Sequence, residues 1–567
     1  MNEGEMSTED LLDRCFQAVE ALCAQQELVP ERLEKSACGL LGLRLTGATR
    51  IWDLEIACNS TALTKLPSIS LRQPRYLLAH VSYNGVICVN DGQGLSLDIE
   101  RREDIVAYTV MAAYDLLEEW ASDEIAGQAE FYNELEGYWL GLPDSCSSRA
   151  AMEVDGNDRL VSVYANTKVK PPKWYFTERN VPAPSEFFIK DMSSQRALYL
   201  HLNEPVAPPA YPAKLDTNFI EALHTKLSPS QLDLWAKLLG PSKNGPRRVA
   251  LLVSVPRAAG GLSLIGMAFG ARGGLIDSAV AVTPLTIRRH TITYMRERGG
   301  ASMELYGKHV AVLGCGAVGS VVADALAASG VGQLTLVDND NYSEDNIFRH
   351  VLDRMWIDAP KVIGLKFELE RKYPGLKVVA IPNAAQDWYK HRNLKDLDGV
   401  VLAFGLPSLE RSFGRALRQT EELLPVLFTW LEPLDLGGHS VLIWSKGEGC
   451  LDCLYRDDEG LAVLSPRTSF HMPNQSVSRN LTGCTSVHVP FGALQSGRTG
   501  ILAAEHMLGA LTGEKGPSYR FWVGEGKASA LQGLSSTPWW STATLISFAE
   551  ASRRVFGRPC SRCRSAS

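Results

Sequence analysis

Three glycines near the middle of the chain have the spacing of a phosphate-binding turn. Gly314, Gly316 and Gly319 follow an apolar run, and a second apolar run farther along ends at Asp338. Glycines let the backbone approach a phosphate, a new helix offers unpaired N–H groups, and the acid can bind a ribose hydroxyl. The pattern predicts a strand, glycine turn, helix and second strand that bind a nucleotide, without saying which one.

The residues after Asp338 favour a triphosphate. Asp340, Asn346, Arg349 and Lys361 follow in that order. A nicotinamide dinucleotide needs an open crevice here for its second half, whereas a triphosphate needs concentrated positive charge and hydrogen-bond donors. We therefore expect ATP, and a plain dinucleotide-binding fold with a charged loop is the alternative.

Two Cys-x-x-Cys pairs form the strongest metal signal in the chain. They are Cys450 with Cys453, and Cys560 with Cys563. Four thiolates make the closed tetrahedral shell of structural zinc, and so long a chain is not a small disulfide-stabilised domain. A redox pair is the alternative, but two pairs in one domain favour Zn²⁺.

Two further cysteines lie outside the metal pairs, and a nucleophilic role for either one comes from the family resemblance described below. Cys88 ends the run Gly85-Val86-Ile87, and Cys484 lies in a polar segment before a predicted helix at 497–511. Covalent catalysis needs an exposed thiol that can ionise, and a nearby helix start favours the thiolate. The alternatives are a buried strand cysteine for Cys88 and an inert loop cysteine for Cys484.

The first 145 residues read as a helix followed by an antiparallel meander. Helical spacing covers 8–26, and short alternating runs lie at 40–45, 51–57 and 77–81. A long helix over 103–120 closes this part of the chain.

The middle of the chain is less regular. Prolines accumulate over 145–212, which favours a linker with some packed structure. A helix is expected over 216–239 and a strand over 248–255. The glycine-rich stretch 260–274 lacks a second strand ending in an acid, so it is not interpreted as a phosphate loop.

The last part of the chain continues the nucleotide-binding pattern. Apolar runs at 378–381 and 399–403 have the composition of buried strands. They predict an α/β fold, with a mostly parallel sheet flanked by helices.

Composition excludes several functional classes. The 567 residues imply several domains, and the net charge of −7 with dispersed Lys and Arg does not indicate nucleic acid or an anionic membrane as partner. No stretch reaches the roughly 20 apolar residues of a membrane span, and the polar start does not resemble a signal peptide. We expect a cytoplasmic protein.

The glycine loop, Asp338-x-Asp340, Asn346-x-x-Arg349 and Lys361 together resemble the ThiF and ubiquitin-activating superfamily. The resemblance implies a Rossmann-like domain that uses ATP and Mg²⁺ to adenylate the C-terminal carboxylate of a small protein, commonly as a homodimer.

Three features of that superfamily bear on particular residues of this chain. An arginine before the first strand reaches a nucleotide phosphate, for which Arg296 and Arg298 are candidates. The usual Mg²⁺-binding aspartate is absent from 404–411, although Arg411 is kept. Asp338 or Asp340 could hold the metal instead.

The N-terminal part resembles a diverged bacterial ubiquitin-conjugating domain, through its helix, meander and His80 … Asn84-Gly85-Val86-Ile87-Cys88 stretch. The resemblance implies that Cys88 carries an acyl group as a thioester. The usual His-Pro-Asn triplet is missing, so His80, Asn84 and Asn90 are the candidates for steadying the oxyanion.

The domain order is similar to that of bacterial antiphage ligases of the CBASS type. It implies a conjugating domain at 1–145, a linker and accessory domain at 146–285, for which an inactive adenylation-like module is one option, and an adenylation domain at 286–567. The C-terminal tail of a cyclic-nucleotide synthase or a ubiquitin-like protein would pass through Cys484 and Cys88 to a target lysine. A sulfur-carrier adenylyltransferase with an unrelated N-terminal module, and a non-enzymatic scaffold, are the alternatives.

Overall fold

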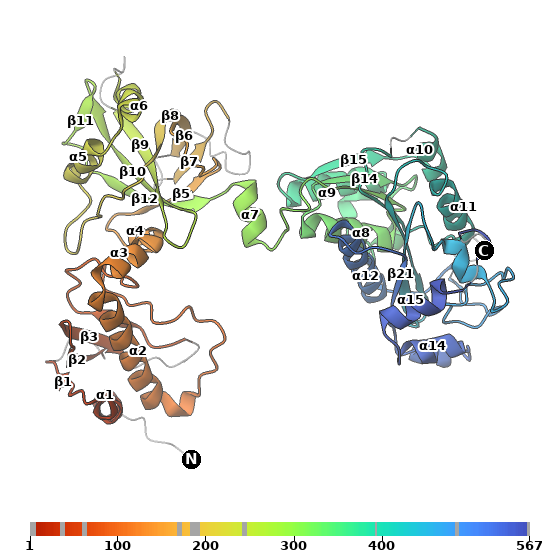
Figure 1. Ribbon diagram of the computed structural model, residues 1–567, viewed down its shortest axis with the longest axis horizontal. Helices are drawn as coiled ribbons and strands as arrows, with labels where there is room; N and C mark the ends of the chain where they lie inside the picture. The colour runs from red at the N-terminus through yellow and green to blue at the C-terminus, as the bar shows by residue number, and fades with distance from the viewer. Residues whose placement is uncertain are drawn as a thin grey trace. The chain divides into compact units, whose positions relative to one another are not determined.

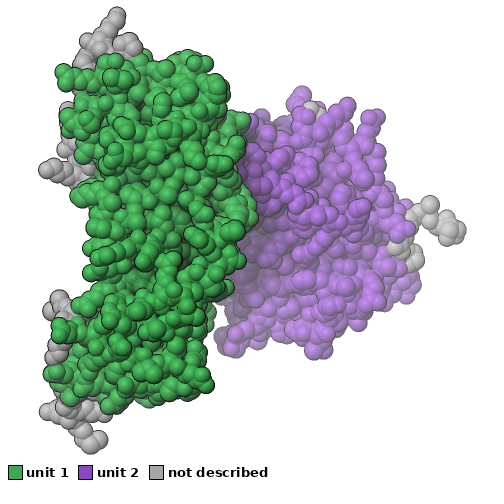
Figure 2. All heavy atoms as spheres, turned by 60° about the vertical axis from the view of Figure 1, so that its left-hand side comes forward, with its two compact units in different colours: residues 1–291 green, residues 292–567 purple. Residues whose placement is uncertain are grey.

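The computed structural model describes residues 7–34, 40–58, 65–166, 173–181, 193–240, 247–391, 394–481, 487–558 and 560–563. The chain forms two compact units, Met1–Thr291 and Ile292–Ser567, coloured separately in Figure 2. The predicted domain boundaries at 145 and 285 stay predictions.

The N-terminal part of unit 1 is a small α+β fold. Its elements are α1 (Thr8–Cys23), η1 (Ala24–Gln26), β1 (Glu31–Arg32), β2 (Leu40–Thr46), β3 (Ile51–Ala57), β4 (Ile69–Leu71), η2 (Ile99–Arg101) and α2 (Arg102–Ser122). The four strands pair in sequence order as an antiparallel meander. α1 and α2 pack side by side (Figure 1), and buried residues such as Val19 and Val110 cover Leu43 and Leu54 of the sheet.

The expected strand at 77–81 is wrong. Only Val81 makes a bridge, to Ile87, while His80 has a left-handed φ of 60° that turns the chain. An apolar run can fill a core from a turn, and Leu78 and Val81 are buried there.

The second part of unit 1 is a ring of strands covered by helices (Figure 1). Its elements are α3 (Glu124–Asn133), α4 (Leu135–Leu140), β5 (Cys146–Ala150), β6 (Arg159–Asn166), β7 (Lys173–Thr177), β8 (Ser193–His201), α5 (Thr217–Thr225), α6 (Pro229–Leu239), β9 (Arg247–Pro256), β10 (Leu262–Arg272), β11 (Leu275–Asp277) and β12 (Thr283–Arg289). The strand order is β11-β10-β12-β5-β7-β6-β8-β9, and β10 also pairs with β9, which closes the ring.

The linker expected over 145–212 is therefore wrong, because four strands of the ring lie in it. The single helix expected over 216–239 is two helices. Ser228 starts the second one, since its hydroxyl accepts a hydrogen bond from Gln231 N–H and Pro229 occupies the first turn.

Unit 2 is a three-layer α/β fold. Its elements are α7 (Ile292–Arg298), β13 (His309–Leu313), α8 (Ala317–Ser329), β14 (Gln333–Val337), η4 (Glu344–Asn346), η5 (Arg354–Trp356), α9 (Lys361–Lys372), β15 (Lys377–Ile381), α10 (Ala385–His391), β16 (Gly399–Leu402), α11 (Pro407–Leu417), β17 (Pro425–Glu432), β18 (Gly437–Trp444), η6 (Leu451–Tyr455), β19 (Arg479–Asn480), β20 (Val487–His488), α12 (Ala493–Leu511), β21 (Ser518–Val523), α13 (Lys527–Ala530), α14 (Pro538–Ala543) and α15 (Phe548–Phe556).

The sheet of unit 2 has the order β15-β14-β13-β16-β17-β18-β21. The first five strands are parallel and the last two pairings antiparallel. α8, α9 and α12 pack on one face, while α10, α11 and α15 pack on the other. The predicted α/β fold is confirmed. In the described residues, none of the helices has the length and apolarity that a membrane crossing requires.

Candidate functional site

The glycine loop lies where the strand order of unit 2 reverses. β14 and β16 flank β13 on opposite sides, so a crevice opens at the carboxyl end of β13. Gly314 has a φ of 85°, and a Cβ at Gly319 would come within 1.8 Å of the Gly314 carbonyl oxygen. Only glycine fits at position 319. At Gly316, by contrast, an added Cβ would meet no atom within 4 Å. Gly316, the N-cap of α8, therefore borders open space where a phosphate could lie.

A chain of polar contacts joins the glycine loop to Lys361. Asp338 accepts a hydrogen bond from Cys315 N–H at 2.6 Å and another from Asp340 N–H at 2.8 Å. Asp340 in turn pairs with the Lys361 ammonium at 2.8 Å. The Lys361 side chain is only 7% exposed, whereas that of Asp340 is 64% exposed. The structure thus brings together three residues predicted from sequence, and either carboxylate has the chemistry to hold Mg²⁺.

His350 belongs to this site and was not predicted as a site residue. Its Nδ1 accepts a hydrogen bond from Leu352 N–H, so its Nε2 carries the proton and donates to the Cys315 carbonyl at 2.8 Å. Burial lowers the pKa of His350 to about 4, so the ring is neutral near pH 7. His350 and Asp338 therefore both hold the Cys315 backbone, the histidine at its carbonyl and the aspartate at its N–H.

Asn346 and Arg349 lie on the turn between these contacts. The Asn346 side-chain oxygen accepts hydrogen bonds from Ser343 N–H and hydroxyl, which shapes the turn η4. The Arg349 guanidinium lies 4.7 Å from the centre of the Phe491 ring. Both residues stay predicted phosphate ligands.

Arg349 also lines a pocket of about 440 Å³ that includes Leu481 and Val487. Those two residues bound the stretch 482–486, and β19 and β20, on either side of it, pair in an antiparallel direction. Cys484 itself lies outside the described residues. Its flanking residues border the same pocket as Arg349.

No described carboxylate replaces the missing aspartate in the loop after β16. Leu406 is 57% exposed there, and Glu410 is buried. The Glu410 carboxylate accepts a hydrogen bond from Gly405 N–H at 3.0 Å, and burial raises its pKa to about 7. The Arg411 guanidinium already has two partners. It pairs with Asp452 at 2.8 Å and lies over the Tyr455 ring.

Arg296 has a structural role in unit 2. Its buried guanidinium donates to the carbonyls of Ser302 and Gly330 at the C-terminal end of α8, which is the end away from the glycine loop. Arg298 is exposed and stays a candidate.

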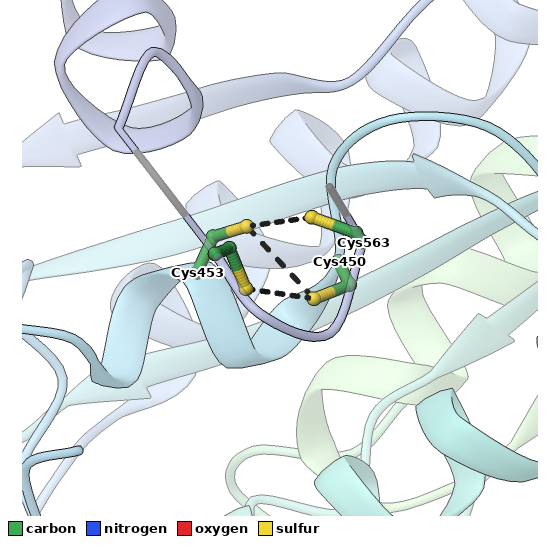
Figure 3. A group of neighbouring side chains, drawn as sticks. Cys450, Cys453 and Cys563 are labelled. Atoms are coloured by element: carbon green, nitrogen blue, oxygen red, sulfur yellow. Dashed lines mark hydrogen bonds between the residues drawn. The ribbon is translucent and has the colours of Figure 1, made fainter. Parts of the chain in front are cut away.

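The four predicted metal-ligating cysteines converge. Figure 3 draws this group and labels Cys450, Cys453 and Cys563. The Sγ atoms of Cys450 and Cys453 are 3.8 Å apart, and those of Cys453 and Cys563 are 3.4 Å apart. Cys560 Sγ lies 3.8 Å from Cys450 Sγ, and all four sulfurs lie within 4.8 Å of one another. Tetrahedral zinc with Zn–S bonds near 2.3 Å separates its sulfurs by about 3.8 Å. The arrangement therefore fits a four-thiolate metal ion.

Cys88 is exposed, as a thioester-forming cysteine must be. It lines a cleft of about 840 Å³ together with His80, Glu134 and Asp91. Burial, followed by the negative charges of Glu134 and Asp91, raises the pKa of the Cys88 thiol. The thiol is therefore not strongly activated in this structure, and its reactivity would depend on the incoming acyl group.

Residues 295–522 match the ThiF family, and with the sheet order and glycine loop this match defines unit 2 as a ThiF-type α/β domain. The chain is similar to the ATP-dependent ubiquitin transferase-like protein Cap2 of Pseudomonas aeruginosa strain BWHPSA011 / Pa011, with 30% identity over 247 residues. This alignment covers 42% of the chain and 43% of that protein. The predicted resemblance to such bacterial ligases is thereby confirmed.

Two more distant similarities accompany this one. Adenylyltransferase and sulfurtransferase MOCS3 of Mus musculus is 38% identical over 88 residues, or 15% of this chain and 19% of that protein. The crystal structure of E. coli MccB matches with 19% identity and a TM-score of 0.30, covering 39% of this chain and 61% of that one. The chain aligns with less than half the length of either curated relative.

Proposed function

We propose that unit 2 uses ATP to activate the C-terminal carboxylate of a partner protein. The observation that carries this proposal is the linked set Cys315, Asp338, Asp340 and Lys361 beside the open N-terminus of α8. Similarity to the ThiF family and to a ubiquitin transferase-like protein supports the same reaction. Backbone N–H groups at Gly316 and the cations of Arg349 and Lys361 would bind the phosphates, and Asp338 the ribose.

In the proposed reaction a carboxylate oxygen of the partner attacks the α-phosphate of ATP. The bond to the bridging oxygen breaks, pyrophosphate leaves, and an acyl-adenylate remains. Lys361 and Arg349 would stabilise the negative charge that develops on the phosphate oxygens. Asp338 or Asp340 would hold Mg²⁺, which supplies further neutralisation of that charge.

Two thiols would then carry the acyl group in series. The Cys484 thiolate displaces AMP to form a thioester, and the Cys88 thiolate displaces Cys484 by exchange. A lysine amine finally displaces Cys88 and forms an amide. The partner would be a cyclic-nucleotide synthase or a ubiquitin-like protein. The protein would act as a homodimer, and its role would be ubiquitin-like conjugation in antiphage defence.

Pyrophosphate exchange tests this proposal with each protein encoded by the neighbouring open reading frames. The expected result is partner-dependent exchange of label from pyrophosphate into ATP, together with a thioester that survives a non-reducing gel. Exchange at background with every partner would favour the non-enzymatic scaffold instead.

The second candidate is a sulfur-carrier adenylyltransferase, which the similarity to MOCS3 favours. It needs Arg349 and Lys361 but neither Cys88 nor Cys484. Partner-dependent exchange that persists without any thioester, in a chain with both cysteines intact, would select this candidate.

A further inference from the structure

A histidine and two glutamates form a cluster beside Cys88. His80 Nδ1 lies 2.9 Å from a Glu134 oxygen, and His80 Nε2 lies 3.6 Å from a Glu130 oxygen. The second Glu134 oxygen accepts the His80 backbone N–H at 2.9 Å. Both ring nitrogens therefore face carboxylates, so the cluster has two negative charges and at most one positive charge.

The cluster is hydrogen-bonded, through the His80 backbone, to Cys88, which is the candidate thioester position. His80 has a φ of 60°, a conformation that costs a non-glycine residue free energy and tends to occur at functional sites. Its carbonyl accepts a hydrogen bond from Cys88 N–H at 2.8 Å, so the turn that strains His80 also sets the Cys88 backbone. His80, Cys88 and Glu134 line the same cleft.

The ring of strands holds the carboxylates in place. Beside Glu134, Asn133 accepts a hydrogen bond from Ala259 N–H at 3.1 Å, and Glu136 accepts one from Leu264 N–H at 2.7 Å. Arg257, on the turn before β10, lines the cleft itself. The second part of unit 1 therefore positions the segment that carries Glu134 and contributes a wall to the Cys88 cleft.

We propose that the cluster of Glu130, Glu134 and His80 receives the primary amine that discharges the acyl group from Cys88. This inference rests on the proposed thioester at Cys88 and names the side chains that receive the acceptor amine. An ammonium group is attracted to the net negative cluster, and a carboxylate takes one proton from it. The neutral nitrogen attacks the thioester carbonyl, the C–S bond breaks, and the second nitrogen proton passes to the sulfur. The products are an amide, the Cys88 thiol and one protonated carboxylate.

The test loads Cys88 of the full chain without ATP, by exchange with a fluorescent diglycine thioester of mercaptoethanesulfonate. Discharge is then timed with free lysine and, separately, with hydroxylamine, which is uncharged at neutral pH and needs no proton removed before it attacks. Glu134→Gln should slow discharge to lysine by about 10²-fold. It should slow discharge to hydroxylamine far less, whereas a loss of structure would slow both discharges to the same extent.

Glu124→Gln is the matched control, since it removes the same charge from α3 at an exposed position and should leave both rates unchanged. Discharge to lysine at the wild-type rate in Glu134→Gln would overturn the inference while leaving the thioester intact. A lysine rate abolished by chelator would also overturn it, and would assign the cluster to a metal ion. Failure of Cys88 to load would contradict the thioester itself, and a Cys88→Ser chain identifies that outcome.

Discussion

Lys361 is the residue on which the proposed nucleotide chemistry depends most directly. Its side chain is nearly buried, yet its partner Asp340 is largely exposed and can be solvated without it. Lys361→Ala should therefore leave the melting temperature almost unchanged while pyrophosphate exchange falls by about 10²- to 10³-fold. Lys372→Ala, at the far end of α9, is the control and should retain exchange. Equal exchange in the two variants would remove Lys361 from the mechanism.

His506 should make unit 2 sensitive to mild acid. Burial lowers its pKa from 6.5 to about 3, and Ser440 and Ser518 are within hydrogen-bonding distance of its two nitrogens. Below pH 6.5 the unfolded chain binds a proton that the folded chain does not. The free energy of unfolding should therefore decrease as pH falls, by about 2 kcal/mol between pH 6.5 and 5.

Thermal melts of the full chain at pH 7.5 and 5.0 measure this effect. Between pH 7.5 and 5.0, the melting temperature of His506→Gln should fall less than that of the wild-type chain. His391→Gln, which replaces an exposed histidine, should show the full wild-type decrease. The same decrease in all three chains would contradict the assignment.

At the scale of single residues, the sequence predicts ligands better than it predicts the groups that position them. Asp338 and Lys361 are recognisable because their types and order suit phosphate and ribose. His350 is not, because its role depends on a contact with the Cys315 carbonyl, which lies in the glycine turn 35 residues earlier in the chain. The sequence does not predict the His80 cluster either, because its two carboxylates lie in and directly after α3, far along the chain from His80.

Among the elements, the turn between β13 and α8 has the tightest steric requirement. Gly319→Ala would place a methyl group against the Gly314 carbonyl and should destabilise unit 2 by about 3 kcal/mol. Gly316→Ala meets no atom and keeps a φ of −76° that alanine accepts, so stability should be nearly unchanged. Its methyl group should instead weaken ATP binding, because it enters the space beside the helix N-terminus.

Thermal melts measure the stability of the two glycine variants, and calorimetric titration measures their affinity for ATP. A stable Gly319→Ala chain with normal ATP affinity would contradict the loop packing described here.

We propose that the four cysteines around η6 hold Zn²⁺ and attach the C-terminal residues to unit 2. Metal analysis of the purified chain should find one zinc per polypeptide, and Cys560→Ser should lose it and melt at lower temperature. Cys88→Ser should keep the metal. Purified wild-type protein without zinc would refute the site.

The elements predicted correctly are those with a strong local pattern. β2, β3, α2 and the strands β13, β14, β15 and β16 of unit 2 have uninterrupted apolar periods or runs, whereas the fifth parallel strand, β17, was not predicted. Of the ring of unit 1 the sequence predicts only β9, at 248–255, because the other strands pair across long stretches of sequence, such as β5 with β12. No window of sequence shows such pairing.

For the molecule as a whole, the proposed reaction requires one acyl group to pass between two thiols in separate units. The sequence suggested this through domain order, and the structure adds an exposed Cys88 in a cleft and a pocket at Arg349 bordered by the residues around 482–486.

The most direct measurement follows a labelled partner on non-reducing gels after addition of ATP, in the wild-type chain and in single cysteine variants. We predict that Cys88→Ala accumulates one thioester, located by peptide mass spectrometry at Cys484, and forms no amide product. Cys484→Ala should form neither thioester nor amide. Unchanged amide formation in either variant would contradict the two-thiol account.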